Sequence, residues 1–246
     1  MTTLDTELAT TWIRRWDAQQ EFYVTDREER FAVIGDIVAN TITTGTVLDL
    51  GCGPGSLAGR LAERLPGARI IGVDADPLLL AMARGRYGAI EFVDADLGGT
   101  SWLAEVPGVV DAAVSTTALH WLTPDQLDGV YRALADRIRP GGVFVNGDHL
   151  GLGDPALDKL AAAVRQGRAA RVGVTGNEEW GAWWEAVGAE PALAQLLTER
   201  SQRTVAHHGS NHLSIAEHRD LLLAAGFRSA SPVWQIGDDH VLAAIR

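Results

Sequence analysis

The sequence has one cysteine, one lysine and no long hydrophobic run among its 246 residues. With Cys52 alone, an internal disulfide is impossible and a zinc site built from thiolates is excluded. No stretch approaches the roughly 18 consecutive apolar residues of a membrane-spanning helix, so we expect no membrane partner. Asp5 and Glu7 stand where a signal peptide would have a basic and then an apolar segment, which predicts a cytoplasmic protein.

Basic residues are outnumbered by acidic ones, and the formal net charge is −11. Proteins that bind DNA or RNA usually present a basic patch to the phosphates, so this charge disfavours a nucleic-acid partner. Lys159 is the only lysine among 21 basic residues, which leaves one candidate for Schiff-base chemistry. A composition of 46% hydrophobic and 22% charged residues is ordinary for a globular protein, and the length suits one large domain.

Hydrophobic periodicity predicts two helices within residues 4–40, with Thr25 or Asp26 as the N-cap of the second. From residue 46, short apolar runs alternate with helical stretches of about 10–15 residues, a pattern typical of a parallel sheet covered on both faces. The expected strands are 47–50, 69–73, 90–93, 109–115 and 142–146, and the expected helices are 57–65, 77–86 and 124–138.

After residue 148 the alternation stops, and residues 154–200 have a mainly helical pattern. A helix over 214–225 and two strands, 230–236 and 240–245, joined by a tight turn, are expected to complete the sheet. We therefore expect a single α/β domain in four parts. These are a helical N-terminal segment (1–43), a core (44–149), a helical insertion (150–212) and a C-terminal helix and hairpin (213–246).

The strongest local signal is the segment 47–55, Val-Leu-Asp-Leu-Gly-Cys-Gly-Pro-Gly, in which an apolar strand runs into alternating glycines. Glycines let the backbone turn sharply and let a ligand approach closely, and the helix that follows offers free N–H groups. Ser56 stands where a dinucleotide fingerprint would have its third glycine. Asp49 is a carboxylate inside an apolar strand, so we expect it to contact a ligand or to cap the loop. Cys52 is expected to be a small packing residue of the same loop.

Carboxylates follow the next two expected strands. Asp74 ends the second strand about 20 residues beyond the loop, where an acid commonly binds the hydroxyls of a ribose. Asp94 and Asp96 end the third strand, and one of them can accept a hydrogen bond from an adenine amino group. Together these features predict a nucleoside-containing cofactor at one edge of the sheet.

The glycine loop and these acids resemble the class I S-adenosylmethionine-dependent methyltransferase family, of the bacterial small-molecule type, over roughly residues 46–148. The segment 115–122, Ser-Thr-Thr-Ala-Leu-His-Trp-Leu, is similar to a His-Trp-Leu stretch of that family. Arg-Pro-Gly-Gly at 139–142 and Ala-Gly-Phe at 225–227 resemble its turn before the fifth strand and its last helix end. The resemblance implies a doubly wound, Rossmann-like sheet of seven strands, mostly parallel with an antiparallel last strand, and S-adenosylmethionine as the cofactor.

The resemblance also implies roles for individual residues. Asp74, with Ala75 beside it, would hold the ribose hydroxyls. Asp96 would accept a hydrogen bond from the adenine amino group, with the Leu97 backbone N–H on a ring nitrogen, and Asp94 is the alternative to Asp96. The methionine part of the cofactor would lie along the loop glycines Gly51, Gly53 and Gly55, near Asp49 and Cys52.

The N-terminal segment from Trp16 to Phe31 resembles a lid found in bacterial members of the family. In such a lid Tyr23 and either Arg27 or Arg30 would bind the carboxylate of the cofactor, since a guanidinium can form bidentate hydrogen bonds with a carboxylate. The alternative is an ordinary solvated helix.

Ligands of open α/β sheets lie beyond the carboxyl ends of the strands, which places Ser115, Thr116 and His120 near the sulfonium. A hydroxyl acceptor needs a base with a pKa near neutral, which favours histidine. A structural hydrogen bond is the alternative role for His120, and a solvated loop is the alternative for the later histidines. We predict no metal site, because the histidines at 207, 208 and 212 lack a carboxylate at a diagnostic spacing. The candidate bases are His120, His149, His207 and His208.

Trp180, Trp183 and Trp184 share one helix face, either as core residues or as an apolar wall for an aromatic acceptor. The sequence therefore predicts transfer of the cofactor's methyl group to a small-molecule acceptor, of apolar or aromatic character. The alternatives are a nicotinamide-dependent Rossmann oxidoreductase, a non-catalytic S-adenosylmethionine-binding module and an RNA methyltransferase. The acceptor atom and the oligomeric state, with a homodimer as one option, stay open.

Overall fold

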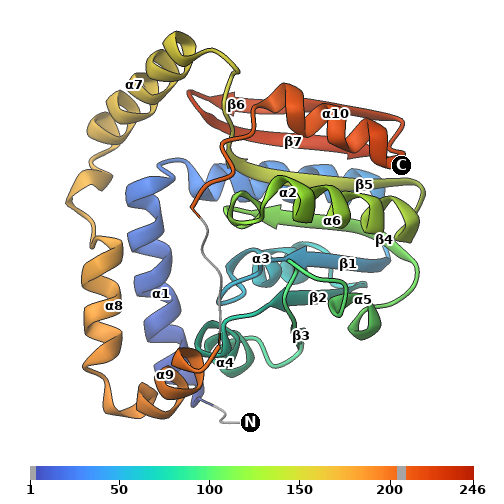
Figure 1. The fold of residues 1–246 in the computed structure, drawn as a ribbon. Helices are drawn as coiled ribbons and strands as arrows, with labels where there is room; N and C mark the ends of the chain where they lie inside the picture. The colour runs from blue at the N-terminus through green and yellow to red at the C-terminus, as the bar shows by residue number, and fades with distance from the viewer. Residues whose placement is uncertain (1–3, 204–208) are drawn as a thin grey trace.

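The computed structural model describes residues 4–203 and 209–246. It is built on one seven-stranded sheet in the order β3-β2-β1-β4-β5-β7-β6 (Figure 1). All neighbouring strands are parallel except at β7, which is antiparallel to both β5 and β6. The predicted fold class is therefore confirmed. The strands are β1 Gly45–Leu50, β2 Ala68–Asp74, β3 Glu91–Asp94, β4 Val110–Thr116, β5 Ile138–His149, β6 Ser229–Ile236 and β7 Asp239–Ile245.

Helices cover both faces of the sheet, and a further group stands beyond its edge (Figure 1). One face packs against α5, α6 and α10, and the other against α2, α3 and α4. The α-helices are α1 Thr6–Tyr23, α2 Arg27–Thr41, α3 Ser56–Arg64, α4 Pro77–Arg86, α5 Trp102–Glu105, α6 Pro124–Arg137, α7 Pro155–Val172, α8 Trp180–Gly188, α9 Ala194–Ser201 and α10 Ile215–Ala225. Short 3₁₀ turns are η1 Leu119–Trp121, η2 Val174–Gly176 and η3 Pro191–Leu193.

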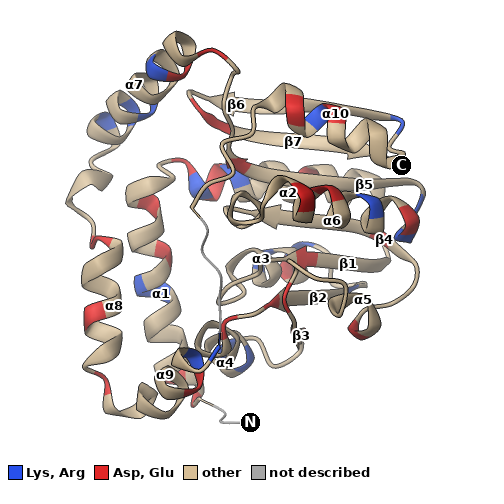
Figure 2. Cartoon of the chain, viewed as in Figure 1, with Lys and Arg blue, Asp and Glu red and all other residues tan. Residues whose placement is uncertain are grey.

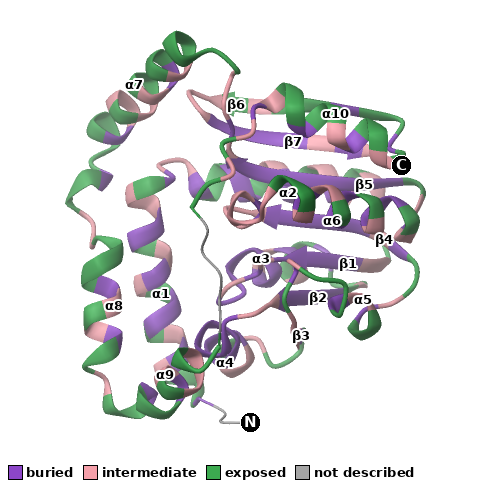
Figure 3. Ribbon diagram, in the orientation of Figure 1, coloured by how far each residue is buried: buried purple, intermediate pink, exposed green. Residues whose placement is uncertain are grey.

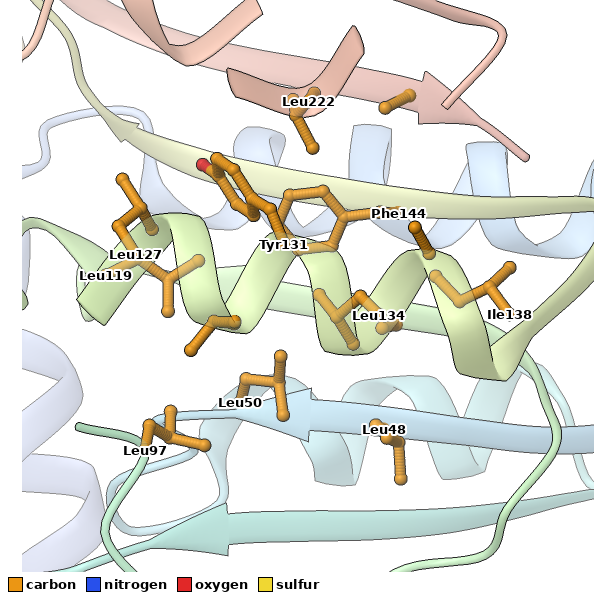
Figure 4. Packing of buried hydrophobic residues seen from close by; sticks show 14 of the residues in the cluster. Leu48, Leu50, Leu97, Leu119, Leu127, Tyr131, Leu134, Ile138, Phe144 and Leu222 are labelled. Atoms are coloured by element: carbon orange, nitrogen blue, oxygen red, sulfur yellow. The ribbon is translucent and has the colours of Figure 1, made fainter. Parts of the chain in front are cut away.

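The alternation of side chains along the strands divides the core in two. Leu48 and Leu50 of β1 point to one face, where they meet Tyr131 of α6 and Phe144 of β5 (Figure 4). Val47 points to the other face and packs with the residues of α2 and α3. Because both faces are covered, the central strands are buried almost throughout (Figure 3).

Some boundaries differ from those expected. β5 begins at Ile138 and ends at His149, well beyond the predicted 142–146, because its extra residues pair with β4 and β7. Asp26 does occupy the N-cap of α2, but its side chain makes no capping hydrogen bond. The carboxylate instead accepts a hydrogen bond from Arg168 of α7, at 2.7 Å. A contact with a distant helix has replaced the local one.

The chain between β5 and α10 forms α7, α8 and α9, and α8 lies beside α1 (Figure 1). Trp183 of α8 is fully buried between Trp12 and Trp16 of α1, with ring centroids 5.8 and 5.0 Å away. Trp180 is 38% exposed. Trp183 is therefore a core residue that holds α8 to α1. Within the described residues, no helix is long and apolar enough to cross a membrane.

Replacing Trp183 by alanine is expected to lower the free energy of unfolding by about 3–5 kcal/mol, because a large buried ring is lost and a cavity remains. The matched change Trp180→Ala, at a partly exposed position on the same helix, should cost about 1 kcal/mol or less. Denaturant unfolding of both variants measures the difference. Equal losses would contradict the core assignment of Trp183.

Candidate active site

The glycine loop is fastened to the end of β2. The backbone N–H groups of Gly51 and Cys52 donate to the carbonyl of Val73, at 2.8 and 3.1 Å. Gly51 and Gly53 have positive φ angles, 68° and 53°, at which a residue with a side chain would be strained. The loop therefore turns sharply at the carboxyl edge of the sheet, where its backbone faces the acids that follow β2 and β3.

Asp74 joins this loop to the chain that follows β2. Its Oδ2 accepts the N–H of Gly53 at 2.7 Å, and its Oδ1 accepts the N–H of Asp76 at 2.9 Å. Burial raises the pKa of Asp74 to about 6, although the N–H groups of Asp76 and Gly53 oppose that rise. The predicted ribose-binding acid thus lies against the glycine loop, with Ala75 next to it.

Asp49 lies beneath the loop and is fully buried. Neither of its carboxylate oxygens has a hydrogen-bonding partner among the described residues, so the expected capping of the loop is not seen. Burial raises the pKa of Asp49 to about 7, opposed by the backbone N–H of Ala58 and reinforced by the charge of Asp74. Burial also raises the pKa of the Cys52 thiol, so Cys52 is a neutral packing residue of the loop.

The two acids after β3 differ in their partners. Asp94 forms an ion pair with Arg203, which also donates to the carbonyl of Ala75 at 3.4 Å. Asp96 is exposed and accepts the N–H of Gly98 at 2.8 Å, while Leu97 is buried in the core. Asp94 is thus engaged by the end of the helical insertion, whereas the partner of Asp96 in the described part of the chain is its own turn.

His120 and Asp148 form a hydrogen-bonded pair at the carboxyl ends of β4 and β5. The Nδ1 of His120 lies 2.9 and 3.0 Å from the two carboxylate oxygens of Asp148. Burial lowers the pKa of His120, but the charge and hydrogen bond of Asp148 raise it above its ordinary value, against the opposing charge of Arg30. With Nδ1–H on the carboxylate, a neutral His120 presents Nε2 as a proton acceptor. Sequence reasoning did not single out Asp148, although an acid inside an apolar strand is the same signal as Asp49.

The other residues expected near the sulfonium lie in different surroundings. Ser115 donates its hydroxyl to the carbonyl of Leu50 at 2.8 Å and so ties β4 to β1. The Oγ1 of Thr116 is buried without a partner in the described part of the chain, as are both ring nitrogens of His149. The Nδ1 of His149 lies 3.6 Å from Oδ1 of Asp238. His207 and His208 lie outside the described residues.

The two predicted lid residues have protein partners. Tyr23 accepts the backbone N–H of Trp180 at 3.3 Å, so its hydroxyl faces the insertion. Arg27 is buried and donates to Asp17 at 2.7 Å, and Asp17 also accepts the hydroxyl of Ser56, at the start of α3, at 2.6 Å. Arg27 is thereby linked to the helix that follows the glycine loop.

Comparisons of the sequence with known proteins show which family this chain resembles. The family model of a methyltransferase domain matches residues 47–142. A trans-aconitate 2-methyltransferase of Azoarcus sp. is 37% identical over 131 residues, which are 52% of this chain and 49% of that protein. One of Methylobacterium nodulans, with the same name, is 31% identical over 184 residues, 70% of this chain and 68% of that protein. The chain spans about half the length of the Azoarcus relative.

The fold is also that of solved methyltransferases. Human N-acetylserotonin methyltransferase, solved in complex with S-adenosylmethionine, superposes with a TM-score of 0.54 at 16% identity, over 94% of this chain and 56% of that one. The sequence relatives distinguish the methyltransferase interpretation from the nicotinamide-dependent oxidoreductase that shares a glycine loop and an acid after β2. The Methylobacterium relative is matched over 68% of its length, the methyltransferase-domain model matches the core, and the sheet has the topology of that fold. The chain therefore belongs to the S-adenosylmethionine-dependent methyltransferase family.

Proposed function

We propose that this chain transfers the methyl group of S-adenosylmethionine to a small molecule bound beyond the carboxyl ends of β4 and β5. The hydrogen bond between Gly53 and Asp74 carries the proposal, because it brings the backbone of the glycine loop and a ribose-binding acid to one point. Ligands of open α/β sheets bind at this edge. The cofactor, when bound, supplies an electrophilic methyl on its sulfonium.

The residues at this edge suit such a cofactor. Asp49 offers a buried carboxyl on which the N–H of Ala58 acts without forming a well-aligned hydrogen bond, and Thr116 offers a hydroxyl that makes no hydrogen bond among the described residues. In the proposal Asp74 holds the ribose and Asp96 the adenine amino group, while Gly51 and Gly53 let the methionine part approach the backbone. Asp96 is preferred to Asp94 because Arg203 already occupies Asp94.

The pair of His120 and Asp148 defines the acceptor side. Asp148 orients the imidazole and keeps Nδ1 protonated, so Nε2 can take a proton from an acceptor hydroxyl. A carboxylate acceptor is already ionised and needs only positioning, which can contribute about 7–11 kcal/mol in well-oriented reactions. The relatives named for trans-aconitate favour such an acid. An apolar acceptor has less support, because Trp183 belongs to the core.

Asp74→Asn is expected to weaken the binding of S-adenosylhomocysteine by about 10- to 100-fold, since one or two charge-assisted hydrogen bonds to the ribose are lost. The asparagine keeps a carbonyl oxygen for the N–H of Gly53. Isothermal titration calorimetry measures the affinity, and Asp136→Asn, at an exposed position of α6, is the control. An unchanged affinity in Asp74→Asn would remove the ribose assignment.

The imidazole of His120 is expected to titrate above pH 6.5, because the charge and hydrogen bond of Asp148 stabilise its protonated form. In Asp148→Asn the midpoint should move to lower pH, since that stabilisation is lost. Proton NMR of the histidine ring signals measures both midpoints, with the His120 signal identified by its absence in His120→Gln. A His120 midpoint that does not change on the Asp148 substitution would show that the pair is not formed.

A further inference from the structure

Arg30, in the first turn of α2, is a fully buried guanidinium that is only partly satisfied. Its Nη1 donates to Oδ1 of Asp239 at 2.7 Å. Its Nε and Nη2 have no hydrogen-bonding partner among the described residues. Buried donors without acceptors are costly, so an unpaired edge of a buried arginine points to a ligand that supplies the missing oxygens.

The side chain of Arg30 runs along the carboxyl end of β5. Its Cδ would be 2.9 Å from a Cβ at Gly147, so only glycine leaves room for the arginine stem there. Gly147 pairs with Thr116 of β4, and paired residues present their side chains to the same face. The Oγ1 of Thr116, which makes no hydrogen bond among the described residues, and the ring of His149, two residues beyond Gly147 and 3.6 Å from Asp238, therefore share this face with Arg30.

The pair of His120 and Asp148 lies at the same end of β5, because Asp148 stands between Gly147 and His149 in that strand. Burial raises the pKa of Asp148, whereas His120 and the positive charge of Arg30 lower it, and the charge of Arg30 also opposes the rise in the pKa of His120. The guanidinium therefore acts on the two residues that define the acceptor side. Arg30 therefore stands on the acceptor side of the sheet edge.

Arg27 and Arg30 are separated by one helical turn but serve different parts of the site. Arg27 reaches Asp17 and, through it, Ser56 after the glycine loop. Arg30 reaches Asp239 of β7 and Gly147 of β5. A carboxylate of the cofactor lies by resemblance near the glycine loop, which is the Arg27 side.

We infer that the unpaired edge of Arg30 binds a carboxylate of the methyl acceptor, so that the substrate is a small carboxylic acid and Arg30 determines that specificity. The Nε and Nη2 atoms form one edge of the guanidinium, which accepts both oxygens of a carboxylate in parallel hydrogen bonds. Asp239 keeps the opposite side of the group engaged and the buried charge compensated. The inference rests on the proposed function, because it names the substrate class of that site.

Helix α7 contacts the turn between β6 and β7, where Arg165 bonds to Asp238, and it carries several basic residues (Figure 2). A small pocket adjoins Asp239 on the α7 side and is lined by Thr25, Asp26, Arg165, Arg168, Ile236 and Asp239. Arg165 and Arg168 bind Asp238 and Asp26 at 2.8 and 2.7 Å. Both arginines are partly exposed, and such ion pairs stabilise little, so they can separate to admit an acid.

The test is calorimetric titration of the protein loaded with S-adenosylhomocysteine, using trans-aconitate and its trimethyl ester. The acid is expected to bind at least 10-fold more tightly than the ester. Arg30→Lys keeps the charge beside Asp239 but loses the edge that makes bidentate hydrogen bonds. It should therefore weaken the binding of the acid by about 10- to 100-fold. The affinity for S-adenosylhomocysteine should stay within about twofold. Arg219→Gln, at an exposed position of α10 away from this site, is the matched control and should leave both affinities unchanged.

Other outcomes separate this inference from the proposed function. If Arg30→Lys weakens the binding of S-adenosylhomocysteine and leaves the affinity for the acid unchanged, Arg30 binds the cofactor and the inference is wrong. If the wild type binds S-adenosylhomocysteine but neither trans-aconitate nor a panel of mono- and dicarboxylic acids, the inference fails while the cofactor assignment stands. If the wild type does not bind S-adenosylhomocysteine, the proposed function fails, and titration of the unloaded protein with the acids still decides the role of Arg30.

A second variant covers the case in which Arg30→Lys does not fold, as judged by thermal unfolding. Gly147→Ala places a methyl group against the stem of Arg30 and should displace its guanidinium without removing the charge. This variant is expected to bind the acid about 10-fold more weakly and to keep its affinity for S-adenosylhomocysteine. An unchanged acid affinity in a folded Gly147→Ala protein would overturn the inference.

Discussion

The site depends on the junction between the glycine loop and the end of β2. Two loop N–H groups bind the carbonyl of Val73, and a third binds the carboxylate of Asp74. These bonds hold a glycine-rich backbone segment against an acid that burial keeps poorly solvated. A cofactor that approaches this edge meets backbone and carboxylate already in position, so little ordering is left to be done on binding.

Buried polar groups are distributed unequally over the carboxyl edge of the sheet. On the side of β1 and β2 they are mainly carboxyls, Asp49 and Asp74, which suit donors such as ribose hydroxyls. On the side of β4, β5 and β7 they include Arg30 and His120, each held by an acid. In the proposed function this difference in charge separates a nucleoside half from an acceptor half, although the chain as a whole carries a net charge of −11.

Much of the fold followed from local patterns, because strand periodicity, glycine turns and helix starts are properties of neighbouring residues. The strands and the closing hairpin were predicted in this way, whereas the antiparallel last strand was implied by the family resemblance. The capping role of Asp26 was not realised, since Arg168 of a distant helix binds its carboxylate instead. The tryptophans of α8 shared a predicted face, but only packing against α1 showed that Trp183 is core.

The sequence by itself determined the glycine loop, the acids after β2 and β3 and the candidate histidine after β4, because each depends on a short motif at a strand end. Only the tertiary structure decided which partner each charge has. Asp148 pairs with His120 through the register of β4 and β5, and Arg30 meets Asp239 across 209 residues of chain. Such pairings depend on how whole elements pack, which no local pattern of residues specifies.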